Sequence, residues 1–148
     1  MNVLGAIVAG FVGTVVISMV MAAAPMMGMP KMDIVGMLGS MFGKLNRPLG
    51  WMMHLMMGVV FALIYALLWS WGMGSATWLY GLVFGAVHWL VAGMGMGMIP
   101  IMHAGIKSGK VKAPGLWMTN NGGAKAFMGG LVGHMVFGLA VALVYAVF

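Results

Sequence analysis

The amino-acid sequence predicts an all-α, polytopic membrane protein whose four transmembrane helices form a bundle of two duplicated helical hairpins. Three observations lead to this fold class. Hydrophobic residues make up 64% of the 148 residues and charged residues only 5%, whereas soluble domains carry about 25% charged residues. Four long stretches contain no Asp, Glu, Lys or Arg. Two of those stretches also carry the same motif.

The four uncharged stretches are long enough to cross a membrane, because a helix of about 20 apolar residues spans the hydrocarbon core. Together with their loops they make one membrane domain over residues 1–148. A shorter amphipathic helix at the membrane interface is expected over residues 32–45, where apolar residues recur at helical spacing and Asp33 can cap the first turn. The four predicted spans cover residues 3–24, 52–71, 77–99 and 126–148.

The basic residues predict the orientation. All seven Lys and Arg side chains lie in, or border, the loops that follow the first and third spans, and the connection over residues 72–76 has no charge. Since Lys and Arg favour the cytoplasmic side, we expect both loops in the cytoplasm and both termini on the other side of the membrane. Residues 105–125 are interpreted as a flexible basic loop. The basic residues are Lys31, Lys44, Arg47, Lys107, Lys110, Lys112 and Lys125.

The composition excludes several classes of function. The chain has no cysteine and a single acidic residue, Asp33, so it has no thiolate metal site, cysteine nucleophile or pair of catalytic carboxylates. We therefore expect a non-enzymatic protein. The net charge of +6 is assigned to membrane topology and not to nucleic acid. The absence of any carboxylate within a span also argues against an ion-coupled transporter.

An internal repeat relates the two halves of the chain. The second and fourth spans share H-x3-G-x3-A-L-[IV]-Y-A at an offset of 80 residues, starting at His54 and His134. The first and third spans align more weakly at an offset of 75, for example Gly10 with Gly85. This predicts two parallel hairpins related by a pseudo-two-fold axis along the membrane normal.

Small residues recur every fourth position along each span, as in Ala6, Gly10 and Thr14. Such stripes let helices approach closely in lipid. Because the chain has more of this surface than four helices need and has no catalytic groups, we interpret it as an accessory subunit. Its expected partners are other membrane subunits of a respiratory, photosynthetic or oxygenase complex.

His54 and His134 are the candidate cofactor ligands. They lie at matching depth on the small-residue faces, where two imidazoles from two helices could hold the iron of haem b or hydrogen-bond a quinone. Gly58 and Gly138, one turn further along, would leave room for a flat macrocycle. Copper is a further alternative at the same pair.

A plain packing role is the competing interpretation of these histidines. Each imidazole could donate a hydrogen bond to a backbone carbonyl, or to Thr14 or Ser18 across a helix interface. His88 lies in the third span without a counterpart in the repeat, so it is a weaker candidate ligand than His54 and His134.

Methionine is unusually abundant, with 21 residues. Thioether sulfurs select Cu(I), so a methionine tract with a histidine suggests copper handling. Methionine also fills irregular gaps in apolar cores, and both interpretations stay open. The two tracts are Met21, Met26, Met27, Met29 and Met32, and Met94, Met96, Met98 and Met102 with His103.

The motif that begins with Gly50 and Trp51 and runs through His54, together with its partner at His134, resembles a family of small four-span prokaryotic membrane proteins of unknown function. The resemblance covers most of the chain. It implies a four-helix membrane bundle and an inner-membrane location, and it adds no activity.

Overall fold

The structure is a computed structural model that describes residues 1–148, and it contains helices but no β-strand. Four helices are long and apolar enough to cross a membrane, which confirms the predicted all-α class and the four long apolar helices. Each lies close to its predicted range. They are α1 (Val3–Ala23), α3 (Arg47–Ser70), α4 (Trp78–Gly95) and α7 (Gly123–Tyr145).

Short helical segments continue or connect the long helices. The third long helix changes at Gly95 into a 3-10 turn and then into α5, where Pro100 occupies the first turn. The short segments are η1 (Ala24–Met27), α2 (Ile34–Gly39), η2 (Met96–Met98), α5 (Ile99–Met102), α6 (Ala104–Lys107) and η3 (Leu116–Asn121).

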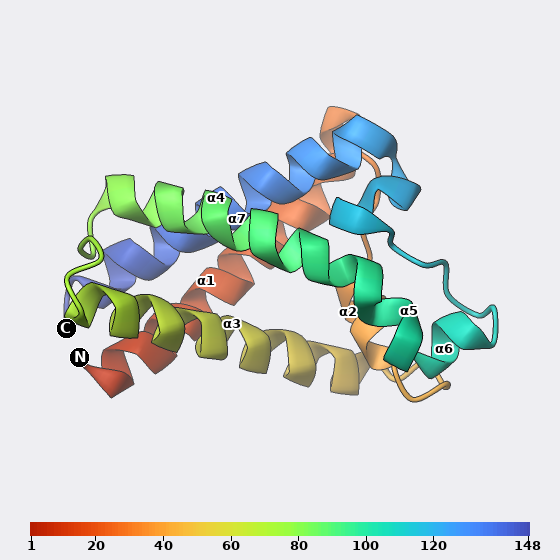
Figure 1. Cartoon of the computed structure of the whole chain (residues 1–148), viewed down its shortest axis with the longest axis horizontal. Coiled ribbons are helices and arrows are strands. Elements are labelled where there is room, and N and C mark those ends of the chain that lie inside the picture. The colour runs from red at the N-terminus through yellow and green to blue at the C-terminus, as the bar shows by residue number, and fades with distance from the viewer.

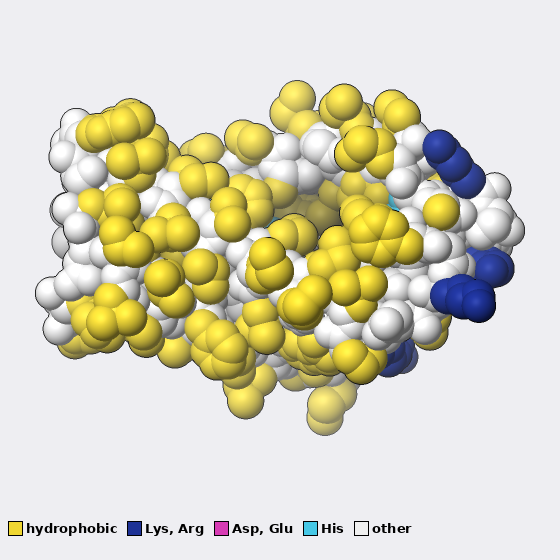
Figure 2. Space-filling view, turned by 90° about the horizontal axis from the view of Figure 1, so that it is seen from below, with side chains coloured by type: hydrophobic (Ala, Val, Ile, Leu, Met, Phe, Trp, Pro, Cys, Tyr) yellow, Lys and Arg dark blue, Asp and Glu magenta, His cyan; other side chains and the backbone are white.

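The two ends of the molecule differ in charge. Both termini and the short turn between α3 and α4 lie at one end, and the two long connections lie at the other (Figure 1). On the face shown in Figure 2, the Lys and Arg side chains gather at the end that carries these connections. The fold therefore brings the two basic loops to the same end, as the charge pattern requires.

Glycines mark two close helix crossings. α1 crosses α3 at Gly10, where an added Cβ would lie 2.6 Å from the Cα of Val59. α4 crosses α7 at Gly138, where an added Cβ would collide with the carbonyl oxygen of Gly81 and lie 2.8 Å from the nitrogen of Gly85. Only glycine allows the two backbones to come this close, so these positions determine how the helices pack.

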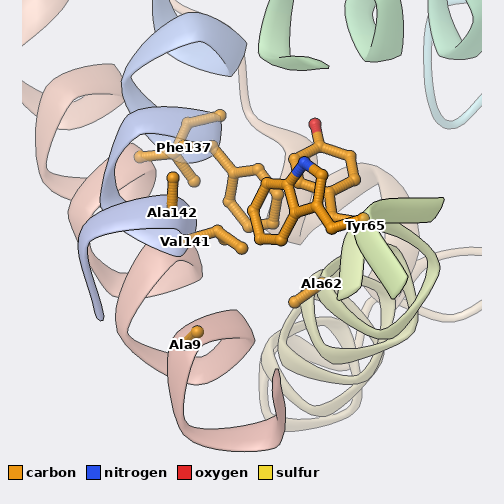
Figure 3. Packing of buried hydrophobic residues seen from close by; sticks show 8 residues of the cluster. Ala9, Ala62, Tyr65, Phe137, Val141 and Ala142 are labelled. Atoms are coloured by element: carbon orange, nitrogen blue, oxygen red, sulfur yellow. The ribbon is translucent and has the colours of Figure 1, made fainter. Parts of the chain in front are cut away.

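The core lies where α1, α3 and α7 meet. α1 packs against both α3 and α7, and α4 packs against α7. Tyr65 of α3 and Phe137 of α7 reach toward each other between the helices, with ring centroids 6.1 Å apart (Figure 3). The buried cluster consists of Ala9, Ile17, Ala62, Tyr65, Trp69, Phe137, Val141 and Ala142.

The helix expected over residues 32–45 is shorter in the structure. It ends at Gly39, because the Ser40 hydroxyl bonds back to the carbonyls of Gly36 and Met37 and Gly43 has a φ of +100°. The helix also packs against α3, where Gly39 faces the backbone of Asn46 and Gly50. The structure thus adds a contact with α3, and the interfacial position of this segment stays a prediction.

The segment expected to be a flexible basic loop is partly folded. Met118 is only 2% exposed, and Trp117 Nε1 donates a hydrogen bond to the carbonyl oxygen of Leu90 at 3.1 Å. Trp117 and Met118 both have positive φ, 49° and 57°, which side chains adopt only when the surroundings hold them. The Trp117 ring lies over Gly93, where an added Cβ would collide with it.

Candidate ligand-binding site

A cavity of about 470 Å³ lies inside the bundle, in the half nearer the basic loops. Its walls come from α1, α3, α4 and α7, and α2 covers one side. Figure 2 shows the surface hollowed near the middle of this face. The lining is mostly hydrophobic, and the volume falls in the range of about 300–1,000 Å³ found for small-molecule sites. A second space of about 50 Å³ lies beside it and shares several of its residues.

Three histidines from three helices line both spaces: His54 of α3, His88 of α4 and His134 of α7. The imidazoles of His88 and His134 have centroids 4.8 Å apart and are nearly perpendicular, at 87°. Phe61 covers His88 at 3.8 Å, and Trp89 covers His134 at 4.8 Å. The structure therefore gathers the histidines and holds two of them by aromatic packing.

The hydrogen bonds of the three histidines differ. His134 Nδ1 donates to the carbonyl oxygen of Gly130 at 2.8 Å, in its own helix. His88 Nδ1 lies 3.1 Å from the Tyr65 hydroxyl oxygen of α3. His54 makes no hydrogen bond within the protein. The interpretation of the histidines as packing residues that bond to backbone carbonyls therefore fits His134. It does not account for His54, which has no hydrogen-bond partner in the protein.

Thr14 and Ser18, the alternative partners across the interface, bond within their own helix. The Thr14 hydroxyl donates to the carbonyl oxygen of Gly10, and the Ser18 hydroxyl donates to that of Thr14, both at 2.7 Å. Neither hydroxyl bonds a histidine.

Three charged side chains line part of the cavity. Asp33 and Arg47 form an ion pair at 2.6 Å, and Lys31 lies with them in the lining. Asp33 also caps α2 by accepting a hydrogen bond from the backbone nitrogen of Gly36 at 2.8 Å. The lining of the cavity therefore combines charged groups and imidazoles with a mostly hydrophobic wall.

Aromatic side chains fill the space between α3 and α4, whose backbones do not come close to each other. Tyr65 lies edge-on to Phe84 at 5.1 Å between ring centroids, and Trp69 lies 5.6 Å from the same ring. These rings fill the space between the two helices toward the short turn. The cavity lies on the other side of these rings from the short turn, and Phe61 and His88 are among its lining residues.

The glycines beside the two repeat histidines do not leave space for a macrocycle. An added Cβ at Gly58 would collide with the Thr14 hydroxyl of α1, and one at Gly138 would collide with the backbone of α4. The close pair that the structure forms is His88 with His134, whose centroid separation of 4.8 Å leaves no gap for a porphyrin between the rings.

The methionine tract with His103 is divided between different surroundings. Met94, Met98 and Met102 are exposed on the outer surface, by 58%, 66% and 79%, whereas Met96 lines the cavity. His103 is 1% exposed.

Both ring nitrogens of His103 are already engaged. Nε2 donates to the Met37 carbonyl oxygen at 2.8 Å, and Nδ1 accepts a hydrogen bond from the Ile106 nitrogen at 3.0 Å. In this arrangement the imidazole caps α6, ties it to α2 and has no free nitrogen for copper. No three His, Asp or Glu side chains lie close enough together to hold a metal ion.

His88 is the site residue that the internal repeat does not reveal. It has no counterpart in the repeat, and the repeat was the reason for choosing His54 and His134. The signal that could have found it is simpler: a histidine in the middle of an uncharged apolar span is a functional candidate by itself.

Comparisons with known proteins give no relative. No protein-family model, no curated protein and no solved structure matches this chain.

Proposed function

We propose that this chain is an integral membrane protein that binds a lipid-soluble molecule with a hydrogen-bonding head group, of the quinone class, between α3, α4 and α7. The observation that carries the proposal is the cavity of about 470 Å³ with histidines from three helices in it. Ligand sites are mostly apolar spaces with a few convergent polar groups. A quinone has this character, because its ring is apolar and its two oxygens accept hydrogen bonds.

The repeat supports a cavity that is built into the fold. At an offset of 75 residues His88 takes the place of Gly13, and at an offset of 80 Phe61 takes the place of Val141. An added Cβ at Gly13 would lie 2.9 Å from Val141, so α1 and α7 are in tight contact there. At the corresponding place the His88 imidazole stands against Phe61 at 3.8 Å. In a duplicated bundle, this exchange of glycine for histidine holds α4 away from α3.

The unpaired interface also offers a route for the ligand. The backbones of α3 and α4 do not come close to each other beside the cavity, and the side chain of Met56 on α3 is 60% exposed. An apolar molecule dissolved in the bilayer would enter between these helices with its ring toward the histidines. Its tail would extend into lipid.

We expect the purified protein in mild detergent to bind a benzoquinone with a decyl tail at one equivalent per chain. Trp51 and Trp89 line the cavity, so the quinone should quench tryptophan fluorescence in a saturable way. Trp89→Phe should remove much of this quenching. Trp78→Phe, at the far end of α4 and 60% exposed, should leave it unchanged. Quenching that rises linearly without saturation would reject the proposal.

We also propose that the protein lies in a prokaryotic inner membrane with both basic loops in the cytoplasm. The chain has no cysteine, so single-cysteine variants can be labelled without a background. Ser75→Cys in the short turn should react with a membrane-impermeant maleimide on intact spheroplasts, and Ser108→Cys should react only after permeabilisation. Both side chains are exposed. Reaction of Ser108→Cys from outside would contradict this orientation.

A further inference from the structure

The hydrogen bond of His134 determines which of its ring nitrogens is protonated. Its Nδ1 lies 2.8 Å from the carbonyl oxygen of Gly130, and a carbonyl oxygen can only accept a hydrogen bond. Nδ1 therefore carries the proton. A neutral imidazole has one donor and one acceptor nitrogen, and the neutral form is the one that an apolar cavity favours. His134 Nε2 is thus a hydrogen-bond acceptor.

The hydrogen bond of His88 determines the opposite arrangement. Tyr65 is 3% exposed, and its hydroxyl has one partner in the protein, His88 Nδ1 at 3.1 Å. If the Tyr65 hydroxyl accepted this bond, its own proton would be left without an acceptor in the core, which costs free energy; we therefore assign the hydroxyl as donor and His88 Nδ1 as acceptor. The proton of the neutral His88 imidazole is then on Nε2, which is a hydrogen-bond donor.

Both Nε2 atoms are free to meet a ligand. Neither has a hydrogen-bond partner in the protein. The fully buried side-chain nitrogens and oxygens without a partner are the indole nitrogens of Trp69 and Trp89, so the two imidazole nitrogens reach open space. The spaces that His88 and His134 line are the two cavities. The site thus offers one donor and one acceptor, on rings whose centroids are 4.8 Å apart.

We infer that this site selects the reduced, quinol form of its ligand over the quinone. A quinol hydroxyl can both donate and accept, so a quinol can donate to His134 Nε2 and accept from the Nε2–H of His88. A quinone carbonyl accepts from His88 but has no proton to give, and it leaves His134 Nε2 unpaired in an apolar site. The inference rests on the proposed function and names the redox form that the same site binds. Tyr65 acts as a positioning residue, since it orients the His88 proton toward the ligand.

The test compares the two redox forms of one probe. A benzoquinone with a decyl tail and its dithionite-reduced quinol are titrated separately into the full-length protein in detergent, without oxygen, by calorimetry. We expect the quinol to bind about tenfold more tightly or better, the effect of one unpaired buried acceptor. A tenfold preference would raise the midpoint potential of the bound two-electron couple by about 30 mV, which a redox titration measures independently.

Two matched variants assign the effect to the two nitrogens. His134→Phe keeps an aromatic ring against Trp89 and removes the acceptor, so quinol affinity should fall to the level of the quinone. His88→Phe removes the donor that both forms use, so both should bind more weakly while the preference for quinol is kept. The wild-type ratio decides the matter even if a variant fails to fold. Equal binding of the two forms, or tighter binding of the quinone, overturns the inference alone, whereas no binding of either form overturns the proposed function itself.

Discussion

Replacing Gly138 by alanine should destabilise the bundle by on the order of 3 kcal/mol, the upper part of the usual range for overpacking a tight contact. The added Cβ would collide with the carbonyl oxygen of Gly81 and lie 2.8 Å from the nitrogen of Gly85. Both are backbone atoms, so no side-chain rotation relieves the overlap, and α4 must move away from α7. Unfolding of the purified variant by added SDS in mixed micelles should begin at a lower SDS fraction than for wild type.

Two further variants make the comparison specific. Gly85→Ala should cost about as much, because its Cβ would collide with the His134 carbonyl oxygen across the same crossing. Gly95→Ala is the control on α4, since no atom lies within 4 Å of its added Cβ. Its effect should stay within about 0.5 kcal/mol, or be slightly stabilising because alanine favours a helix more than glycine does. Equal stability of the Gly138 and Gly95 variants would show that α4 and α7 do not cross as described.

The four long helices could be predicted because the cause is general. A backbone surrounded by lipid must satisfy its own hydrogen bonds, so a long uncharged apolar stretch becomes a helix. The charged residues show where each helix leaves the apolar region, and Arg47 and Lys125 lie within the first turn of α3 and α7. The spacing of Gly10 and Gly58 likewise indicated a close contact, because a stripe with a period of four lies on one helix face.

The parts that the sequence did not predict depend on contacts between distant residues. Trp117 and Met118 have positive φ values, and the Trp117 ring packs over Gly93, more than twenty positions earlier in the chain. No local propensity predicts such a backbone conformation. Which histidine lies beside His134 likewise depends on how the helices pack. The repeat suggests His54 because the two share a motif, whereas helix packing brings His88 beside it.

The accessory-subunit interpretation stays a prediction, and its main support is reduced. It assumed more close-packing surface than four helices use. In the structure the glycines at the crossings, such as Gly10, Gly81 and Gly138, meet other helices of the same chain. Much of the small-residue surface is therefore used within the bundle, and what is distinctive about this protein is its internal cavity. The resemblance to a four-span family and the duplication of the hairpins likewise remain predictions.

Filling the cavity should abolish ligand binding while the bundle stays folded. Ala92 of α4 lines the cavity, so Ala92→Phe would place a ring in the space that we assign to the quinol ring. The overlap with a bound ligand should cost on the order of 3 kcal/mol, which corresponds to at least about 100-fold in Kd. The free protein should be as stable as wild type or more so, because filling an internal void commonly stabilises. Calorimetric titration with the decyl-tailed quinol measures the loss.

The neighbouring residue provides a matched control. Val91→Phe adds a ring at a position that is 65% exposed and lies outside the cavity lining, so its Kd should equal that of wild type. The two variants share a helix, a depth and the introduced side chain, and they differ by about 100° around the helix axis, since each turn takes 3.6 residues. Detergent, charge and helix propensity are therefore almost the same in both. Loss of binding in both variants would indicate a general effect of added bulk, and retention in both would place the ligand elsewhere. Loss in Ala92→Phe alone is the result that assigns binding to the space between the three histidines.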